Sequence, residues 1–224
     1  MKLIKVDGRY PLREKIEEAA QVIRAGGLVA FPTETVYGLG ADVFNPSAVA
    51  RVFAVKNRPL NQPLIIAPSS LAEISKLVKK IPATAKKLID KFFPGPLTLV
   101  LLKSKIVPDI LTAGKEKIAL RIPDHPVVLA LLSEVKRPLT ATSANRTGQP
   151  SPTDAQQVAE ALRSTASGSD LILDAGPTKF GIESTILDLT DKPVILRTGA
   201  ISKDAIEAII GPVQVFQKNL INPN

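Results

Sequence analysis

Segments with the apolar spacing of helices alternate with short apolar runs along nearly the whole chain. Over residues 12–25 apolar side chains recur at i, i+3, i+4 and i+7, which predicts a helix, and the run at residues 27–31 directly after it predicts a buried strand. The same order of helix and strand signals then repeats. Such alternation is typical of α/β proteins, in which helices pack on the faces of a sheet.

The expected sheet contains both parallel and antiparallel strands. Only Asp191 and Lys192 separate two strand-like segments, residues 184–190 and 193–198, which is the spacing of a hairpin. Hairpin strands are antiparallel, whereas strands joined through a helix are parallel. Further strands are expected at residues 63–67, 97–102, 118–122, 138–142 and 171–175, and further helices from Asn45-Pro46 onward and at residues 70–79, 83–92, 126–135 and 203–210.

The chain is expected to form one catalytic domain, residues 1–211, followed by a loosely attached tail at residues 212–224. No internal repeat or linker interrupts the first segment, and Gly211 offers a stop for the last helix. Thr153 and Gln156 have the spacing of a capping box before another helix.

Composition excludes several kinds of site. The 224 residues include no cysteine and one histidine, His125, so disulfides, thiolate metal sites, a cysteine nucleophile and a metal site with two histidines are all excluded. A loop role beside a turn proline is the simpler interpretation of His125. No apolar run reaches the roughly 18 residues of a membrane span, and the first residues contain no apolar signal segment. We therefore expect a cytoplasmic protein with no membrane partner.

A net charge of +8 indicates an anionic partner. Ten lysines against three acidic residues lie between positions 76 and 117, which accounts for most of the excess. Two interpretations remain open, solvated lysines on helix surfaces and a basic RNA-binding face. Aromatic residues make up only 4% of the chain, so a base-stacking platform is hard to build.

The stretch KNRP places two cations, Lys56 and Arg58, directly before Pro59. Residues two apart point the same way in an extended chain, and proline favours extended geometry in the residue before it. The stretch thus predicts two positive charges aimed at one anion. The chain contains no P-loop motif, so side chains would have to supply the positive charge for a bound phosphate.

Two polar loops follow predicted strands, where ligands of α/β proteins usually lie. The first, PTETVYGLG at residues 32–40, carries Thr33, Glu34, Thr35 and Tyr37, and its alternative interpretation is a self-capping turn. The second loop, at residues 140–153, carries hydroxyl and amide groups suited to phosphate or sugar oxygens, namely those of Thr142, Ser143, Asn145 and Ser151.

Two arginines lie in or at the end of apolar strands. Arg121 lies within IALRI and Arg197 ends VILR. A buried arginine is costly unless it is paired, so each predicts either a bound carboxylate or phosphate, or an internal salt bridge or exposed edge.

These stretches, in this order, resemble the YrdC-like family of threonylcarbamoyl-AMP synthases. The resemblance covers roughly residues 12–210 and rests on FPTETVYGLGADV, KNRP with PLII, FPGPLTLVL, IALRIPDHP, TSANRTGQPSPT, ESTILDL and ILRTGAI. It implies a YrdC-like α/β fold with a twisted, open, mixed sheet flanked by helices. It also implies a nucleotidyltransferase that converts L-threonine, bicarbonate and ATP to threonylcarbamoyl-AMP and pyrophosphate for the t6A modification of tRNA.

The resemblance also implies roles for individual residues. Lys56 and Arg58 would act in catalysis by facing the ATP phosphates, and Mg²⁺ would be held mainly by those phosphates rather than by the protein. Other ATP contacts would come from Gln62, Lys117, Ser143, Asn145, Ser151 and Arg197. Threonine would be bound by Thr33, Thr35, Tyr37, Arg121 and Ser184. The product would pass to the tRNA threonylcarbamoyl-transfer machinery, with a contact to tRNA itself as a further expectation.

The sequence departs from the family pattern at several positions. Ala67 stands where many members have a threonine-contacting histidine, Gln62 where asparagine is common, and Lys117 where a small hydroxyl residue often contacts ATP. Longer relatives carry a second domain, so the chain is expected to be the short, single-domain form. Two alternatives compete with the synthase, a basic RNA-binding module without turnover and a carbamoyl-transfer domain of a larger maturation enzyme.

Overall fold

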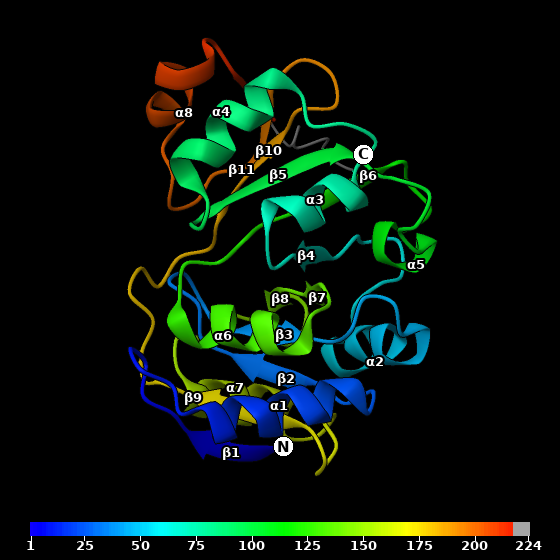
Figure 1. Ribbon diagram of the computed structural model, residues 1–224, viewed down its shortest axis with the longest axis vertical. Helices are drawn as coiled ribbons and strands as arrows, with labels where there is room; N and C mark the ends of the chain where they lie inside the picture. The colour runs from blue at the N-terminus through cyan, green and yellow to red at the C-terminus, as the bar shows by residue number, and fades with distance from the viewer. Residues whose placement is uncertain (217–224) are drawn as a thin grey trace, which may run out of the picture.

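The computed structural model describes residues 1–216, and in this part of the chain the strands form two mixed sheets (Figure 1). The five-stranded sheet has the order β1 (Lys2–Lys5), β9 (Leu171–Asp174), β2 (Val29–Phe31), β3 (Gly38–Gly40), β8 (Thr142–Ser143). The seven-stranded sheet has the order β12 (Gln214–Val215), β11 (Val194–Arg197), β10 (Thr185–Asp188), β5 (Leu97–Leu102), β6 (Lys117–Leu120), β4 (Ile65–Ala67), β7 (Leu139–Thr140).

The predicted α/β fold with parallel and antiparallel strands is confirmed, and its strands divide between two sheets instead of forming one. The predicted hairpin is present, since β10 and β11 are antiparallel. Strands joined through helices include parallel pairs, such as β4 with β6 and β2 with β9.

Eight helices flank the sheets in the described chain. They are α1 (Arg13–Arg24), α2 (Pro46–Lys56), α3 (Leu71–Leu77), α4 (Ala83–Phe92), α5 (Asp109–Thr112), α6 (Pro126–Val135), α7 (Ala155–Leu162) and α8 (Lys203–Ile210). The longest has 12 residues, and none is long and apolar enough to cross a bilayer. Figure 1 shows α4 and α8 on one face of the seven-stranded sheet, and α1 and α6 beside the five-stranded sheet.

The seven-stranded sheet has one covered face and one open face because its side chains alternate. Leu99, Leu187 and Ile195 are buried in the same core cluster as Leu88 of α4 and Ile206 of α8. On each of these strands, the residues next to the buried one in sequence point to the opposite face of the sheet, which α4 and α8 do not cover. This second face becomes the floor of the site described below.

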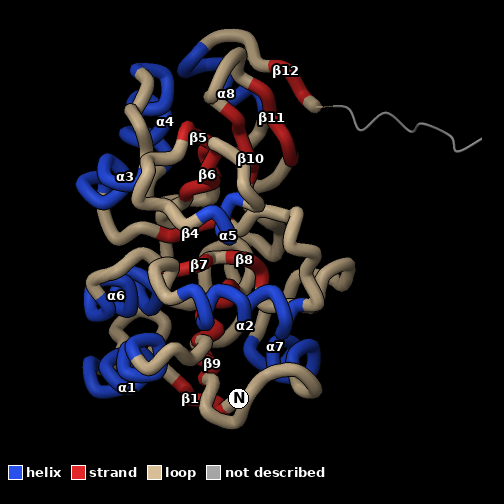
Figure 2. Tube along the Cα trace, turned by 90° about the vertical axis from the view of Figure 1, so that its right-hand side faces the viewer, coloured by secondary structure: helices blue, strands red, loops and turns tan. Residues whose placement is uncertain are grey.

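One short segment joins the two sheets. β7 pairs with β4 of the seven-stranded sheet, and two residues later β8 pairs with β3 of the five-stranded sheet. The backbone N–H of Ala141, between the two strands, donates to Ile65 O at 2.8 Å, and that of Thr140 in β7 donates to Ala41 O at 2.9 Å. Figure 2 shows β7 and β8 in the middle of the molecule, between β4 and the lower strands.

Most predicted elements are present within a few residues of their expected bounds, and the missed ones are short. β1, β3, α5 and β12 have two to four residues each, too few for a clear periodicity. The predicted capping box is wrong by one position, because Asp154 is the N-cap and its carboxylate accepts from the N–H of Gln157 at 2.9 Å.

The first residues of the predicted tail are packed against the domain. Val213 is buried, and β12 pairs in parallel with β11. This part of the segment is therefore an edge strand and not a loose extension. The remaining tail residues, 217–224, lie outside the described part of the chain.

Gly199 lies so close to the chain before β10 that a side chain there does not fit. A Cβ at this position would lie 2.3 Å from Glu183 O and 2.5 Å from Ser184 C. We expect Gly199→Ala to lower the free energy of unfolding by about 1–3 kcal/mol, as forced overpacking does. Gly168→Ala is the matched control, because a Cβ there meets nothing within 4 Å. Urea unfolding of both variants tests this, and equal stabilities would contradict the tight contact.

Candidate functional site

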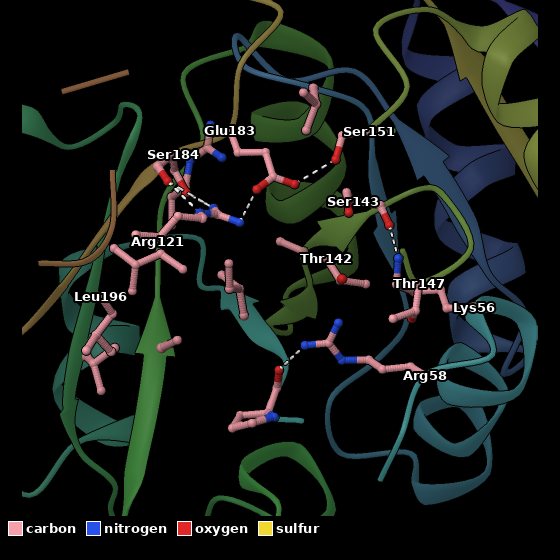
Figure 3. A pocket seen from close by; sticks show the side chains of 18 of the residues that line it. Lys56, Arg58, Arg121, Thr142, Ser143, Thr147, Ser151, Glu183, Ser184 and Leu196 are labelled. Atoms are coloured by element: carbon pink, nitrogen blue, oxygen red, sulfur yellow. Dashed lines mark hydrogen bonds and ion pairs between the residues drawn. The ribbon is translucent and has the colours of Figure 1, made fainter. Parts of the chain in front are cut away.

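A cavity of about 630 Å³ opens between the two sheets (Figure 3). Its floor is the uncovered face of the seven-stranded sheet, where Ile65, Ala119 and Val100 are neighbours in register on β4, β6 and β5. Ile186 and Leu196 continue this apolar floor on β10 and β11. The opposite wall comes from the end of α2 and the loop after β8.

Cationic side chains surround the apolar floor. Two carboxylates, those of Glu183 and Asp188, also line the cavity, but the cations outnumber them. The six cationic residues are Lys56, Arg58, Lys115, Lys117, Arg121 and Arg197. Burial weakens the screening of such charges by water, and a concave wall concentrates their field. The cavity is therefore built to attract an anion larger than a single carboxylate.

Lys56 is the last residue of α2, and its ammonium group is buried. Its Nζ donates to Ser143 O at 2.5 Å, to Asn145 O at 2.6 Å and to Asn145 Oδ1 at 3.3 Å, and the residue is 1% exposed. Desolvation and the nearby Arg58 charge lower the pKa of Lys56 to about 7. The three acceptors match the three N–H groups of the ammonium form, so they offset part of its burial cost, and this form prevails below pH 7.

Arg58 reaches the same cavity by a different backbone route from the one predicted. The expected extended run is wrong, because Lys56 is helical and Asn57 adopts the left-handed conformation, with φ of 48°. The Arg58 guanidinium then donates to Gln62 O at 3.1 Å and to Pro63 O at 2.7 Å. Gln62 takes part through its backbone, and its side chain is not among the lining groups. Burial lowers the pKa of Arg58 from its usual value.

The polar loop before β3 satisfies itself. Thr33 Oγ1 donates to Val36 O at 2.6 Å and accepts from the N–H groups of Thr35 and Val36. Tyr37 donates its hydroxyl proton to Gly176 O at 2.8 Å, and burial raises its pKa to about 12. Thr33, Thr35 and Tyr37 are buried beside the cavity, and only Val36 of this loop lines it. Their assignment to threonine binding stays a prediction.

Arg121 forms an internal ion pair and also lines the cavity. Its Nη2 lies 2.7 Å from Glu34 Oε2, and the two side chains are 8% and 5% exposed. Its Nε donates to Gly95 O at 3.1 Å, and Glu34 Oε2 also accepts from the N–H of Asp124. Glu34 Oε1 has no hydrogen-bond partner, and the Nη2 proton is not aligned with its carboxylate. The pair is buried but incompletely satisfied, which leaves hydrogen-bonding capacity at the cavity wall.

A second polar network lines the other side of the cavity. Glu183 Oε2 pairs with Arg197 Nη1, and Glu183 Oε1 accepts from Ser151 Oγ at 2.6 Å. Arg197 also donates to Ser184 O from Nε at 3.1 Å and from Nη2 at 2.9 Å. Desolvation lowers the pKa of Arg197, while the Glu183 charge opposes this effect. Sequence reasoning did not single out Glu183, although it begins the ESTILDL motif.

The remaining predicted residues fall into two groups on the cavity wall. Lys117, the first residue of β6, donates to Asp188 Oδ2 at 2.8 Å. Asn145 is held by Lys56 and donates from Nδ2 to Gln149 O at 2.5 Å, while the backbone of Ser143 receives Lys56. Of the thirteen predicted site residues, nine line the cavity and four, Thr33, Thr35, Tyr37 and Gln62, do not.

Three carboxylates hold cations of the cavity wall. The pair of Glu34 with Arg121 is buried, whereas the pairs of Glu183 with Arg197 and of Asp188 with Lys117 are partly exposed. These pairs keep the cations oriented while the cavity as a whole stays positive. A site of this kind selects its ligand by charge and by geometry. Its donors are preorganised, so they need little reorganisation when the ligand binds.

His125 has a structural role in the described chain. It is the N-cap of α6, and its Nδ1 accepts from the N–H of Val127 at 3.2 Å. Burial lowers its pKa. Within residues 1–216 no three His, Cys, Asp or Glu side chains gather as a metal site.

The buried Glu34–Arg121 pair makes a stability prediction. Glu34→Gln leaves Arg121 as an uncompensated buried charge, so we expect the free energy of unfolding to fall by about 3 kcal/mol or more. The matched control is Glu116→Gln, which removes the exposed pair with Lys79. Urea unfolding should show an unchanged midpoint for the control. An unchanged midpoint for Glu34→Gln as well would mean that the pair does not anchor this wall.

Comparisons with known proteins identify relatives of this chain. The Sua5/YciO/YrdC family model, described as telomere recombination, matches residues 21–199. A threonylcarbamoyl-AMP synthase of Pyrococcus abyssi is 47% identical over 210 residues, which are 91% of this chain and 61% of the relative. A protein of the same name from Bacillus subtilis is 45% identical over 212 residues, with coverage of 94% and 60%.

A solved structure supports the same relationship. The crystal structure of P. abyssi Sua5 complexed with L-threonine superposes with a TM-score of 0.92 at 45% identity, covering 96% of this chain and 63% of that one. The chain thus spans about three fifths of the length of these relatives. The family match at residues 21–199 includes every residue that lines the cavity. The chain belongs to the Sua5/YciO/YrdC family.

Proposed function

We propose that the protein is a threonylcarbamoyl-AMP synthase. It would convert L-threonine, bicarbonate and ATP to threonylcarbamoyl-AMP, pyrophosphate and water, which makes it a nucleotidyltransferase. The observation that carries this proposal is the convergence of six cations on one cavity with an apolar floor. Such a site suits a polyphosphate joined to a less polar group. The names of the P. abyssi and B. subtilis relatives support the same reaction.

The nucleotide would lie along the α2 side and the hairpin side of the cavity. Arg58 faces the cavity with a guanidinium, which suits bidentate phosphate contacts. Lys56 would add its charge from behind the Ser143 loop. The other proposed nucleotide contacts on the wall are Lys117, Ser143, Asn145, Ser151 and Arg197, and Gln62 stays a prediction at the rim.

Threonine would bind near Arg121. Its guanidinium is buried and has an unaligned N–H, so a ligand carboxylate would complete its hydrogen bonding. Ser184 is 1% exposed and also lines the cavity, where its hydroxyl shares a 2.8 Å hydrogen bond with Thr98. The crystal structure of P. abyssi Sua5 contains L-threonine, which supports an amino-acid ligand for this chain as well.

The proposed chemistry needs no protein nucleophile. The threonine amine and bicarbonate form a carbamate with loss of water, and one carbamate oxygen attacks the α-phosphorus of ATP. The bond from that phosphorus to the bridging oxygen breaks, and pyrophosphate leaves. The protein would position the reactants and stabilise the developing charge, tasks suited to arginine and lysine. We assign no general base.

Mg²⁺ fits this arrangement as an ion held mainly by the ATP phosphates. Proteins commonly bind it through substrate phosphates and one or two carboxylates. Both cavity carboxylates are already engaged, Glu183 with Arg197 and Asp188 with Lys117. When bound, Mg²⁺ would neutralise phosphate charge during the transfer.

The product would pass to the machinery that transfers the threonylcarbamoyl group to tRNA. Most lysines of the 76–117 segment are exposed, including Lys76, Lys80, Lys86, Lys87 and Lys91 on or beside α3 and α4. They support direct contact with tRNA as a second proposal. Such contact would weaken as salt is raised, whereas turnover would not require these lysines.

Pyrophosphate release tests the proposed reaction. We expect release from ATP only when both L-threonine and bicarbonate are present with Mg²⁺. Arg58→Ala should lower kcat/KM by about 100-fold or more, the effect of losing one charge-stabilising donor. Lys87→Ala is the control, since Lys87 is exposed on α4 and lies outside the cavity. Release that does not depend on threonine would refute the proposed substrate.

The lowered pKa of Lys56 predicts proton uptake on nucleotide binding. With a pKa of about 7 Lys56 is mostly neutral at pH 8, and a nearby phosphate raises the pKa. Affinity is therefore full below pH 7 and falls as pH rises toward the pKa of the bound state. Calorimetry at pH 8 in buffers of different ionisation enthalpy should show uptake of about one proton per nucleotide.

Two variants control the proton-uptake measurement. Lys56→Arg keeps a charged group across this range, so uptake should disappear. Lys117→Arg should retain the uptake, because it leaves Lys56 unchanged. Uptake that persists in Lys56→Arg would assign the proton to another group.

A further inference from the structure

Glu183 is one of the described residues that line the cavity, and its carboxylate lies among the cations there. This carboxylate does not itself bind the anion that the cations attract. Its charge favours the protonated forms of Lys56, Arg58 and Arg197. A carboxylate in an anion site repels the ligand, so by charge alone it lowers affinity. Its presence therefore requires a second role that compensates for this repulsion.

The contacts of Glu183 suggest that role. Both of its oxygens are used, one by Ser151 Oγ at 2.6 Å and the other by Arg197 Nη1. Ser151 lies in the loop after β8, and Arg197 ends β11, so Glu183 joins two segments that are 46 positions apart in the chain. Without Glu183 the Ser151 hydroxyl would lose this hydrogen bond, and Arg197 would be held on this wall only by Ser184.

The backbone of Glu183 is held in place against the start of β10. Its carbonyl accepts from the N–H of Ala200 at 3.0 Å, and Gly199 packs directly against the same carbonyl. The next residue, Ser184, is 1% exposed, and its hydroxyl bonds both Thr98 and Arg197. The carboxylate thus projects from a rigid support, which is the geometry of a group that orients others.

Arg197 is oriented by residues 183 and 184 together. Its Nε and Nη2 donate to Ser184, and its Nη1 pairs with Glu183. A guanidinium has five N–H groups, so this arrangement leaves capacity for a ligand while removing rotational freedom. An arginine held in this way loses less entropy when it binds a phosphate.

We infer that Glu183 is a positioning residue that holds Ser151 and Arg197 in their binding orientation for a nucleotide polyphosphate. The inference rests on the proposed function, because the proposed function identifies the ligand as a nucleotide. It makes a prediction opposite to that of simple electrostatics. Removal of the negative charge should weaken anion binding, although the cavity becomes more positive.

The test compares Glu183→Gln with Glu116→Gln. Each variant removes one negative charge with little change in size, but Glu116 is exposed and pairs with Lys79, which does not line the cavity. Binding of tripolyphosphate and of a non-hydrolysable ATP analogue is measured by calorimetry. We expect Glu183→Gln to raise Kd about tenfold, a typical coupling within one network, and Glu116→Gln to leave it unchanged or lower it.

A second substitution shows whether Glu183 acts through Ser151. Ser151→Ala should also raise Kd, and in that background Glu183→Gln should add no more than about threefold, because coupled residues are not additive. Thermal unfolding verifies that each variant is folded. If Glu183→Gln does not fold, Ser151→Ala still tests whether the Ser151–Glu183 contact contributes to binding, because it removes that contact from the loop. A role limited to stability would leave the binding constants of the folded variants unchanged.

The outcomes separate this inference from the proposed function. Tighter binding by Glu183→Gln, or fully additive effects with Ser151→Ala, would overturn the positioning role and make Glu183 a competitor of the ligand. Wild-type protein that binds both probes but releases no pyrophosphate would refute the proposed reaction alone. Wild-type protein that binds neither probe would refute both.

Discussion

The site depends on one strand segment that two sheets share. Residues 139–143 pair with β4 through β7 and with β3 through β8. Thr140 is fully buried, and its hydroxyl donates to Leu39 O at 2.9 Å and accepts from the N–H of Ala41 at 3.0 Å. Backbone groups that face both sheets in this way leave the chain almost no freedom to shift. The two walls of the cavity are therefore held at a fixed separation.

The buried ammonium of Lys56 extends this constraint into the loop. Beyond β8 the chain turns away from both sheets, and Lys56 holds it by binding the carbonyls of Ser143 and Asn145. The link is reciprocal, because the N–H of Thr147 donates to Lys56 O at 2.7 Å. Removing one partner of such a buried charged contact leaves the others unsatisfied, which is costly. The loop and the end of α2 thus behave as one unit.

The sequence by itself determined the elements, the fold class and the chemistry of most of the wall. Apolar spacing predicted α1 and α6, the two-residue turn predicted the β10–β11 hairpin, and motif order predicted nine residues that line the cavity. These signals are local, because periodicity and turn residues act over a few positions. The motifs also placed Lys56 and Arg58 at one cavity, although the extended backbone expected between them is wrong.

Tertiary structure decided which polar groups are free to meet a ligand. Thr33 and Tyr37 looked available in the sequence, yet they bond to Val36 O and Gly176 O. Glu183 carried no signal of its own, because its partners Ser151 and Arg197 are distant in the chain. Whether a buried polar group finds a hydrogen-bond partner depends on which residues the fold packs beside it. The local sequence pattern does not show which distant residues those are.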